Sequence, residues 1–215
     1  MFLLNDDLYF PHVESADIDG FLAIGGDLSM ERLLFAYRKG IFPWYNEGEP
    51  ICWWSPDPRF VLFPEELKVS KSMHPVLNST KLRFTINRDF STVIQNCKTI
   101  NRYGQNGTWI SPEMQDAYTQ LHYKGFAHSA ETWMDGELVG GLYGIRLGNI
   151  FFGESMFSKE KNAGKYAFIN YLKKLKEEKV ALIDCQVYTQ HLENLGARMI
   201  TRETFTTILN SNIGQ

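Results

Sequence analysis

The sequence has few of the residues that build disulfide frameworks and metal sites. Among its 215 residues are three cysteines and five histidines. The cysteines (Cys52, Cys97 and Cys185) are odd in number and far apart, and no histidine stands at ligand spacing from another. The chain therefore encodes neither a disulfide framework nor a zinc site, and we expect no metal.

Long apolar runs are missing as well. No segment approaches the length of a membrane span, and the residues from Met1 to Asp7 show neither the basic leader nor the apolar stretch of a signal peptide. We expect a cytoplasmic protein with no membrane partner. Its net charge of −3 argues against a general nucleic-acid coat.

Acidic residues are absent between Leu67 and Arg88, a stretch that holds five basic ones. Basic side chains contact phosphate groups, and each neutralised phosphate makes binding more sensitive to salt. The stretch indicates either a phosphate-facing patch or an ordinary solvated surface. Its basic members are Lys68, Lys71, Lys81, Arg83 and Arg88.

What the chain does have is a composition suited to a packed core, with 44% hydrophobic and 22% charged residues. The N-terminal part is rich in turns and aromatic side chains, and a proline-punctuated stretch ends at Pro64. Because such stretches often join compact units, we predict a small N-terminal α/β domain over residues 1–63 and a larger domain over residues 64–215.

Capping signals and periodicity predict the secondary structure. One helix is expected between Ser29 and Gly40, and another from Ser111 to about Tyr123. Asp135-Gly136 is typical of a tight hairpin. A strand meander followed by helix, strand and helix predicts an α+β fold with a mixed sheet. The remaining predicted elements are strands over 128–133, 138–146 and 150–157, a helix over 163–176, a strand around Asp184 and a short helix from Thr189.

Polar side chains interrupt two of the predicted strands. Asp184 and Gln186 stand two apart in an apolar run, so alternation puts both on one face. Glu154 shares a face of its own strand with Phe152 and Met156. Burying such groups costs several kcal/mol unless partners compensate. If the two strands are neighbours, the three polar side chains converge in one cleft. The structural alternative is that a buried arginine or backbone amides hold Asp184.

Several short segments stand in a fixed order along the chain: residues 25–29 (GGDLS), 40–44 (GIFPW), 53–59 (WWSPDPR), 107–110 (GTWI), 138–144 (LVGGLYG), 153–158 (GESMFS) and 182–186 (LIDCQ). From about Phe10 to Ala197 the chain resembles the bacterial leucyl/phenylalanyl-tRNA–protein transferases. The resemblance implies a small N-terminal domain followed by a GNAT-like acyltransferase domain. It also implies an enzyme that transfers leucine, phenylalanine or, less well, methionine from aminoacyl-tRNA to proteins beginning with Arg or Lys, which marks them for degradation through the N-end rule.

The resemblance also implies roles for single residues. Asp184 and Gln186 would be the catalytic pair, and Glu154, with a contribution from Asp184, would bind the basic first side chain of the acceptor. Trp53 and Trp109 would stack on the terminal adenine of the tRNA. The aminoacyl pocket would be lined by Leu142, Phe151 and Met156, with Tyr118 nearby, and plain core packing is the alternative for these positions.

The same resemblance implies no cofactor. The expected partners are Leu-tRNA, Phe-tRNA and proteins with N-terminal Arg or Lys, and a monomer is the default expectation. The five basic residues between Leu67 and Arg88 would contact tRNA phosphates.

The expected chemistry fits these residue types. Attack of an amine on an ester is downhill and needs mainly a neutral nucleophile in good alignment. An α-amino group with a pKa near 8 is about one tenth neutral at pH 7. The carbonyl oxygen of Gln186 can accept a hydrogen bond from the amine, and Asp184 can polarise that amide. Proton transfer through the ribose hydroxyls of the tRNA is an alternative route.

Two other functions are alternatives to this one. An acetyl-CoA-dependent GNAT enzyme needs a glycine-rich pyrophosphate loop, but the corresponding residues, Lys161 to Tyr166, place a tyrosine where a small residue is needed. A non-catalytic module that binds tRNA ends or N-terminal peptides would keep Trp109 and Glu154 and tolerate loss of Gln186.

Overall fold

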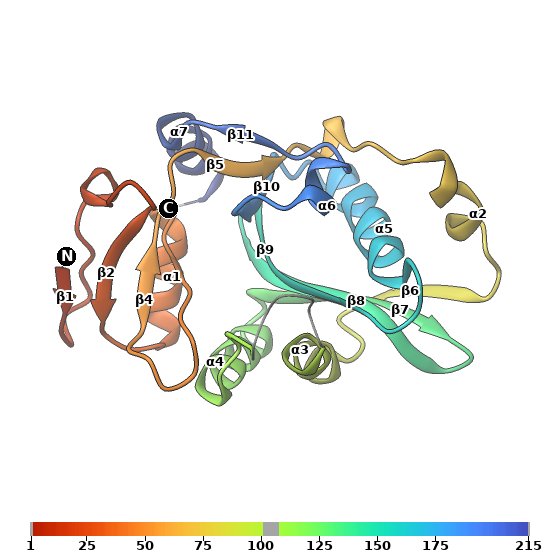
Figure 1. The fold of residues 1–215 in the computed structure, drawn as a ribbon, viewed down its shortest axis with the longest axis horizontal. Coiled ribbons are helices and arrows are strands. Elements are labelled where there is room, and N and C mark those ends of the chain that lie inside the picture. The colour runs from red at the N-terminus through yellow and green to blue at the C-terminus, as the bar shows by residue number, and fades with distance from the viewer. Residues whose placement is uncertain (1, 101–107, 215) are drawn as a thin grey trace.

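The computed structural model describes residues 2–100 and 108–214, which form two β-sheets with helices packed around them (Figure 1). The smaller sheet has the strand order β1-β2-β4-β3. Its strands are Phe2–Leu4 (β1), Phe21–Gly25 (β2), Cys52–Trp54 (β4) and Phe42–Pro43 (β3), and helix α1 (Met30–Arg38) lies beside them.

The larger sheet is a mixed sheet of seven strands in the order β11-β5-β10-β9-β8-β7-β6. Its pairs are antiparallel except for β9 and β10, which run parallel. In this order the two parallel strands, β9 and β10, lie in the interior of the sheet. The bounds are Arg198–Ile200 (β11), Arg59–Leu62 (β5), Leu182–Gln186 (β10), Ile150–Ser158 (β9), Glu137–Leu147 (β8), Ala127–Met134 (β7) and Leu82–Ile86 (β6).

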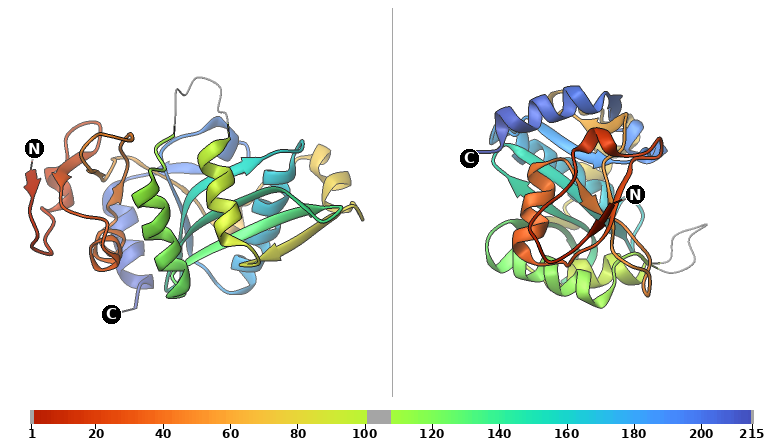
Figure 2. Two further views of the ribbon diagram at one scale, coloured as in Figure 1. Left: turned by 90° about the horizontal axis from the view of Figure 1, so that it is seen from below. Right: turned by 90° about the vertical axis from the view of Figure 1, so that its left-hand side faces the viewer.

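Helices cover both faces of this sheet. Helices α3 (Phe90–Thr99) and α4 (Pro112–Tyr123) lie on one face, and α5 (Ala163–Glu177) lies on the other (Figures 1 and 2). The two faces have separate sets of buried apolar residues, one around α3 and α4 and one around α5. The remaining helical segments are Val13–Ser15, Pro64–Glu66, Lys71–Met73, α2 (His74–Leu77), α6 (Gln190–Glu193) and α7 (Arg202–Asn212).

Most of the predicted elements are present near their predicted bounds. Ser29 and Ser111 cap α1 and α4, because each side chain accepts a backbone N–H three residues further on. The hairpin between β7 and β8 turns at Asp135 and Gly136, both with positive φ. The predicted fold class, α+β with a mixed sheet and a small N-terminal α/β unit, is confirmed.

The predicted boundary at residue 63 falls too late in the chain. Strand β5 begins at Arg59 and pairs with β10 and β11 inside the larger sheet. The chain thus leaves the small sheet after Trp54. Helix α7 joins the two parts again, since a Cβ at Gly40, just after α1, would lie 2.8 Å from the ring of Phe205.

Within residues 2–100 and 108–214, no helix is long and apolar enough to cross a membrane. The same residues contain no group of three or more His, Cys, Asp and Glu side chains that could hold a metal ion.

The first residues of α5 pack directly against β8 at Gly140, which leaves no room for a larger residue there. A Cβ at Gly140 would lie 2.5 Å from the carbonyl carbon of Ala163 and 2.7 Å from the nitrogen of Gly164. Because backbone atoms cannot move aside as a flexible side chain can, Gly140→Ala is expected to lower the free energy of unfolding by about 1–3 kcal/mol. Urea denaturation measures this loss. Gly214→Ala, with nothing within 4 Å, is the control, and equal stability of both variants would contradict the packing described here.

Candidate active site

Asp184 lies in β10 and is completely buried, as is its partner Arg59 in β5, with exposed fractions of 0% and 1%. The guanidinium Nε donates to Asp184 Oδ1 at 2.8 Å, and Nη2 donates to Oδ2 at 2.7 Å. A carboxylate removed from water needs such a compensating charge. The structural alternative, a buried arginine that holds Asp184, is therefore the observed one. The contribution of Asp184 to acceptor binding stays a prediction.

Gln186 departs from the alternation that the sequence predicts. A register shift separates Asp184 from Gln186 in the pairing with β5, and Gln186 has a φ of +61°. Its backbone N–H donates to Asp184 Oδ1 at 3.0 Å. Its side-chain Nε2 donates to Glu154 Oε1, also at 3.0 Å. The side chains of Asp184 and Gln186 thus have different partners, Arg59 and Glu154.

Glu154 lies at a second irregularity, in β9. In the pairing of β8 with β9, Tyr143 is opposite Ser155 and Gly144 is opposite Gly153, so Glu154 is an extra residue. The insertion reverses the alternation beyond it. Phe152 packs with the α3 and α4 side, whereas Met156 packs with the α5 side. The prediction that both share one face is therefore wrong.

Two buried tyrosines hold the carboxylate of Glu154. Tyr37 Oη of α1 lies 2.7 Å from Oε1, Tyr118 Oη of α4 lies 3.1 Å from Oε2, and the two hydroxyls are also within hydrogen-bond distance of each other. Each hydroxyl has a single hydrogen, so the two tyrosines donate in two of these three contacts. Burial raises the pKa of both tyrosines well above the ordinary value, with the charge of Glu154 as the next cause, so both remain protonated donors. Helix α1 of the small domain therefore contributes to a site in the large one.

The environment of Glu154 also changes its own titration. Burial raises the pKa of this carboxyl to about 7, and the charge of Asp184 adds to the rise. The hydrogen bonds from Tyr37, Tyr118 and Gln186 act in the opposite direction. Near neutral pH the group can thus carry a charge or a proton.

Two adjoining pockets share Glu154 and Gln186 as part of their walls. The first, of about 270 Å³, is bordered by Trp109 and by Trp44, which is 41% exposed. The second, of about 190 Å³, is mostly apolar. Its apolar walls are formed by Leu142, Met156, Phe168, Ile183, Cys185 and Leu192.

The predicted aminoacyl pocket contains two of its four proposed residues. Leu142 and Met156 line the apolar pocket. Phe151 does not line this pocket. Its side chain is buried in the core and packs edge-on against Tyr171 of α5, with 5.1 Å between ring centroids. Tyr118 is fully buried and its hydroxyl faces Glu154. Phe151 and Tyr118 are therefore wrong as lining residues, and Cys185, which lines the pocket, was not among the predicted residues.

Of the two predicted stacking tryptophans, only Trp109 borders a pocket. Trp53 has an exposed fraction of 0%, packs edge-on against Phe10 and donates its Nε1 hydrogen to Gly25 O at 2.9 Å. The prediction for Trp53 is therefore wrong. Trp44, directly after Pro43, borders the same pocket as Trp109 and was not among the predicted residues, because its exposure shows only in the structure.

The five basic residues between Leu67 and Arg88 are all exposed. None lines either of the two pockets. Three of them lie on or beside β6, the edge strand that stands three strands from β9, and Arg88 places its guanidinium 4.3 Å above the ring centroid of Trp133. Their contact with tRNA phosphates stays a prediction.

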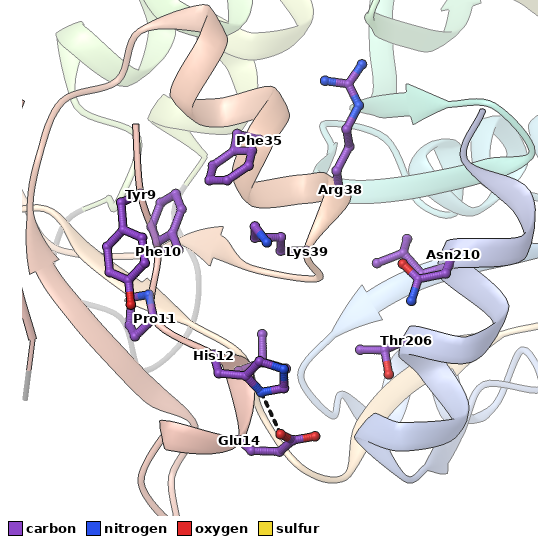
Figure 3. A pocket seen from close by; sticks show the side chains of 12 residues that line it. Tyr9, Phe10, Pro11, His12, Glu14, Phe35, Arg38, Lys39, Thr206 and Asn210 are labelled. Atoms are coloured by element: carbon purple, nitrogen blue, oxygen red, sulfur yellow. Dashed lines mark ion pairs between the residues drawn. The ribbon is translucent and has the colours of Figure 1, made fainter. Parts of the chain in front are cut away.

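A larger pocket, of about 580 Å³, lies between the N-terminal segment, the end of α1 and helix α7 (Figure 3). Tyr9 and Phe10 stand on one side of it and Thr206 and Asn210 on the other. None of the predicted site residues lines this pocket, so size alone does not identify the reaction centre.

Comparisons with known proteins give the family. Residues 61–210 match the family described as leucyl/phenylalanyl-tRNA protein transferase, and residues 26–57 match its N-terminal domain. The protein of that name from Flavobacterium johnsoniae is 59% identical over 98% of this chain and all of its own length. The one from Pseudomonas fluorescens is 53% identical over 99% of this chain and 95% of its own.

A mixed sheet with a carboxylate and an amide beside an apolar pocket is suited to acyl transfer. The chain belongs to the leucyl/phenylalanyl-tRNA protein transferase family, and it is an aminoacyltransferase.

Among solved structures, L-PGS from Bacillus licheniformis matches with a TM-score of 0.43 at 13% identity, covering 80% of this chain and 57% of its own. A GCN5-related N-acetyltransferase from Kribbella flavida matches with a TM-score of 0.36 at 10% identity, covering 78% and 60%. These weak likenesses carry no information about the chemistry of this chain.

The raised pKa of Glu154 predicts a pH-dependent stability difference. A carboxyl with a higher pKa in the folded state stabilises the fold in its protonated form, and this contribution is lost as the pH rises from about 4.5 to about 7. Glutamine does not titrate. The free energy of unfolding of Glu154→Gln, relative to wild type, should therefore rise by up to about 3 kcal/mol between pH 4.5 and pH 8.

Urea denaturation at both pH values measures this difference. The control is Glu66→Gln, because the hydrogen bond from Arg198 lowers the pKa of the exposed Glu66 carboxyl, so its difference should have the opposite sign. A pH-independent difference for Glu154→Gln would contradict the assignment.

Proposed function

We propose that this enzyme transfers leucine, phenylalanine and, less well, methionine from aminoacyl-tRNA to the α-amino group of proteins that begin with Arg or Lys. The acceptors would then be degraded through the N-end rule, in the cytoplasm, and the enzyme would act as a monomer. The observation that carries the proposal is the position of Glu154 and Gln186, bonded to each other where the apolar pocket meets the tryptophan-lined pocket.

The apolar pocket would hold the side chain of the donor amino acid. The apolar wall residues Leu142, Met156 and Cys185 favour an apolar side chain without a branch at Cβ over a polar one. Such a pocket separates ligands that differ by one methylene by only about 1–3 kcal/mol, so several donors are expected. Trp44 and Trp109 would stack on the terminal adenine, at about 1–3 kcal/mol per stacked base.

Glu154 would bind the acceptor. A guanidinium or ammonium group that enters this poorly solvated site needs a carboxylate, and the pocket beside Trp109 gives it access to Glu154. The cation in turn favours the ionised form of a carboxyl whose pKa is about 7. Acceptors with an uncharged first side chain would leave this charge unpaired.

Gln186 would align the attacking amine. The carboxylate of Glu154 only accepts hydrogen bonds, so the amide nitrogen of Gln186 faces it and the carbonyl oxygen faces the other way. That oxygen can accept a hydrogen bond from the neutral amine and direct its lone pair at the ester carbon. A C–N bond forms, the ester C–O bond breaks, and the proton released by the amine neutralises the ribose oxygen that leaves.

The start of α5 argues against the acetyl-CoA alternative. The backbone N–H of Gly164 donates to Ser158 Oγ at 2.9 Å, and that of Ala163 donates to Glu160 O at 3.1 Å. A pyrophosphate at this helix terminus would have to compete for these amides. The five basic residues between Leu67 and Arg88 would instead contact phosphates of the tRNA.

A transfer assay tests the proposed function. The protein is incubated with labelled Leu-tRNA or labelled acetyl-CoA and with peptides that begin with Arg or Ala. Label is expected to move from Leu-tRNA to the Arg peptide alone. Transfer from acetyl-CoA would support the acetyltransferase, and binding of Leu-tRNA without transfer would support a non-catalytic module.

Glu154→Gln tests the acceptor site separately. The variant keeps the shape of the side chain but cannot pair with a cation, and loss of one partner of a buried charge pair costs at least about 2 kcal/mol. The KM for an Arg-starting peptide should therefore rise about 30-fold or more, while the KM for Leu-tRNA changes less than about 2-fold. Steady-state kinetics with each substrate varied in turn measures both values. Equal losses for acceptor and donor would refute the assignment.

A further inference from the structure

Arg59 lies where three parts of the chain meet. Its side chain starts in β5, and its guanidinium carbon is 4.7 Å from the ring centroid of Phe42 in β3 and 4.6 Å from that of Phe205 in α7. These rings belong to the small sheet and to the C-terminal helix. The guanidinium is thus enclosed between two aromatic faces, with a third side occupied by the carboxylate of Asp184.

Stability alone does not account for this pair. Taking both charges out of water costs several kcal/mol per ion, and well-packed apolar residues of similar volume would often stabilise a core as well or better. Both side chains are at most 1% exposed, so water does not reduce that cost. The pair therefore needs an explanation beyond stability, and the residues that it holds in place supply one.

The carboxylate of Asp184 has one further partner, which is the backbone N–H of Gln186. Gln186 adopts a left-handed conformation, with a φ of +61°. For a residue with a side chain this conformation costs about 1–3 kcal/mol, and it persists only where the surrounding structure imposes it. The hydrogen bond to Asp184 Oδ1 spans the register shift and fixes this conformation. The same turn directs the Gln186 amide to Glu154.

We propose that Arg59 is a positioning residue for the transfer reaction. It fixes the two carboxylate oxygens of Asp184, Asp184 fixes the backbone of Gln186, and Gln186 presents its carbonyl oxygen to the attacking amine. Through Phe42 the same guanidinium supports the segment that continues to Trp44 in the wall of the tryptophan-lined pocket. The inference rests on the role proposed above for Gln186.

A double-mutant cycle between Arg59 and Gln186 tests it. Arg59→Lys keeps the charge but removes the two-pronged contact with Asp184. The measured quantity is the single-turnover rate of leucyl transfer at saturating enzyme, which isolates the chemical step from binding. We expect Arg59→Lys to lower this rate about 10-fold or more, with the KM for the Arg peptide changed less than about 3-fold. In a Gln186→Ala background the same substitution should cost less than about 2-fold.

The matched control is Arg198→Lys in β11. Arg198 makes the same two-pronged contact, with Glu66 at 2.8 and 3.0 Å, but it lies on the surface of the neighbouring strand. This variant should transfer leucine at the wild-type rate. Urea denaturation of each variant sets assay conditions in which all are folded. If Arg59→Lys does not fold, Asp184→Asn, which preserves volume, replaces it in the cycle with the same expected result.

The outcomes separate the inference from the proposed function. If the fold-reductions in the single-turnover rate multiply in the double variant, Arg59 acts independently of Gln186, and the inference is overturned. A Gln186→Ala variant that transfers at the wild-type rate would overturn it as well. A wild-type protein that transfers no leucine would instead overturn the proposed function, and the inference with it.

Discussion

The site depends on a half-buried carboxylate at the junction of two domains. Glu154 would be a costly residue in the middle of a sheet without Tyr37 and Tyr118, whose hydroxyls replace the water it has lost. The two tyrosines come from α1 and α4, so correct packing of these helices is required before the carboxylate is satisfied. The amide of Gln186 completes the set and ties the carboxylate to the neighbouring strand.

Two irregularities in the central strands create the room for this arrangement. Strands β9 and β10 pair in parallel as far as Phe152 and Asp184. Beyond that point the extra residue Glu154 and the left-handed Gln186 turn both strands away from regular alternation. Bulges of this kind re-aim side chains next to active sites. The pockets on either side of Glu154 and Gln186 lie beyond the point where the parallel ladder ends.

Sequence reasoning succeeded where local signals decide the structure. The serines at positions 29 and 111, the Asp135-Gly136 turn and the apolar stripe of α5 predict their elements because each acts over a few residues. The polar residues Asp184, Gln186 and Glu154 were recognised because buried polar groups are costly wherever they stand.

Reasoning from strand alternation failed at the same residues. It cannot anticipate an extra residue, so it placed Phe152 and Met156 on one face and paired Asp184 with Gln186. Nor does a tryptophan show in sequence whether it is buried, so Trp53 was predicted to stack on the adenine although its side chain lies in the core. The ion pair of Asp184 with Arg59 joins residues 125 positions apart, beyond the reach of any local pattern.

The contact of α1 with Glu154 makes the titration of this carboxyl depend on the packing of the two domains. If the small domain moved away from α4, Tyr37 would no longer reach Glu154. Loss of a hydrogen bond that favours the ionised carboxylate would raise the pKa of that carboxyl further. The charge at the centre of the large sheet is therefore coupled to the position of a helix from the other domain.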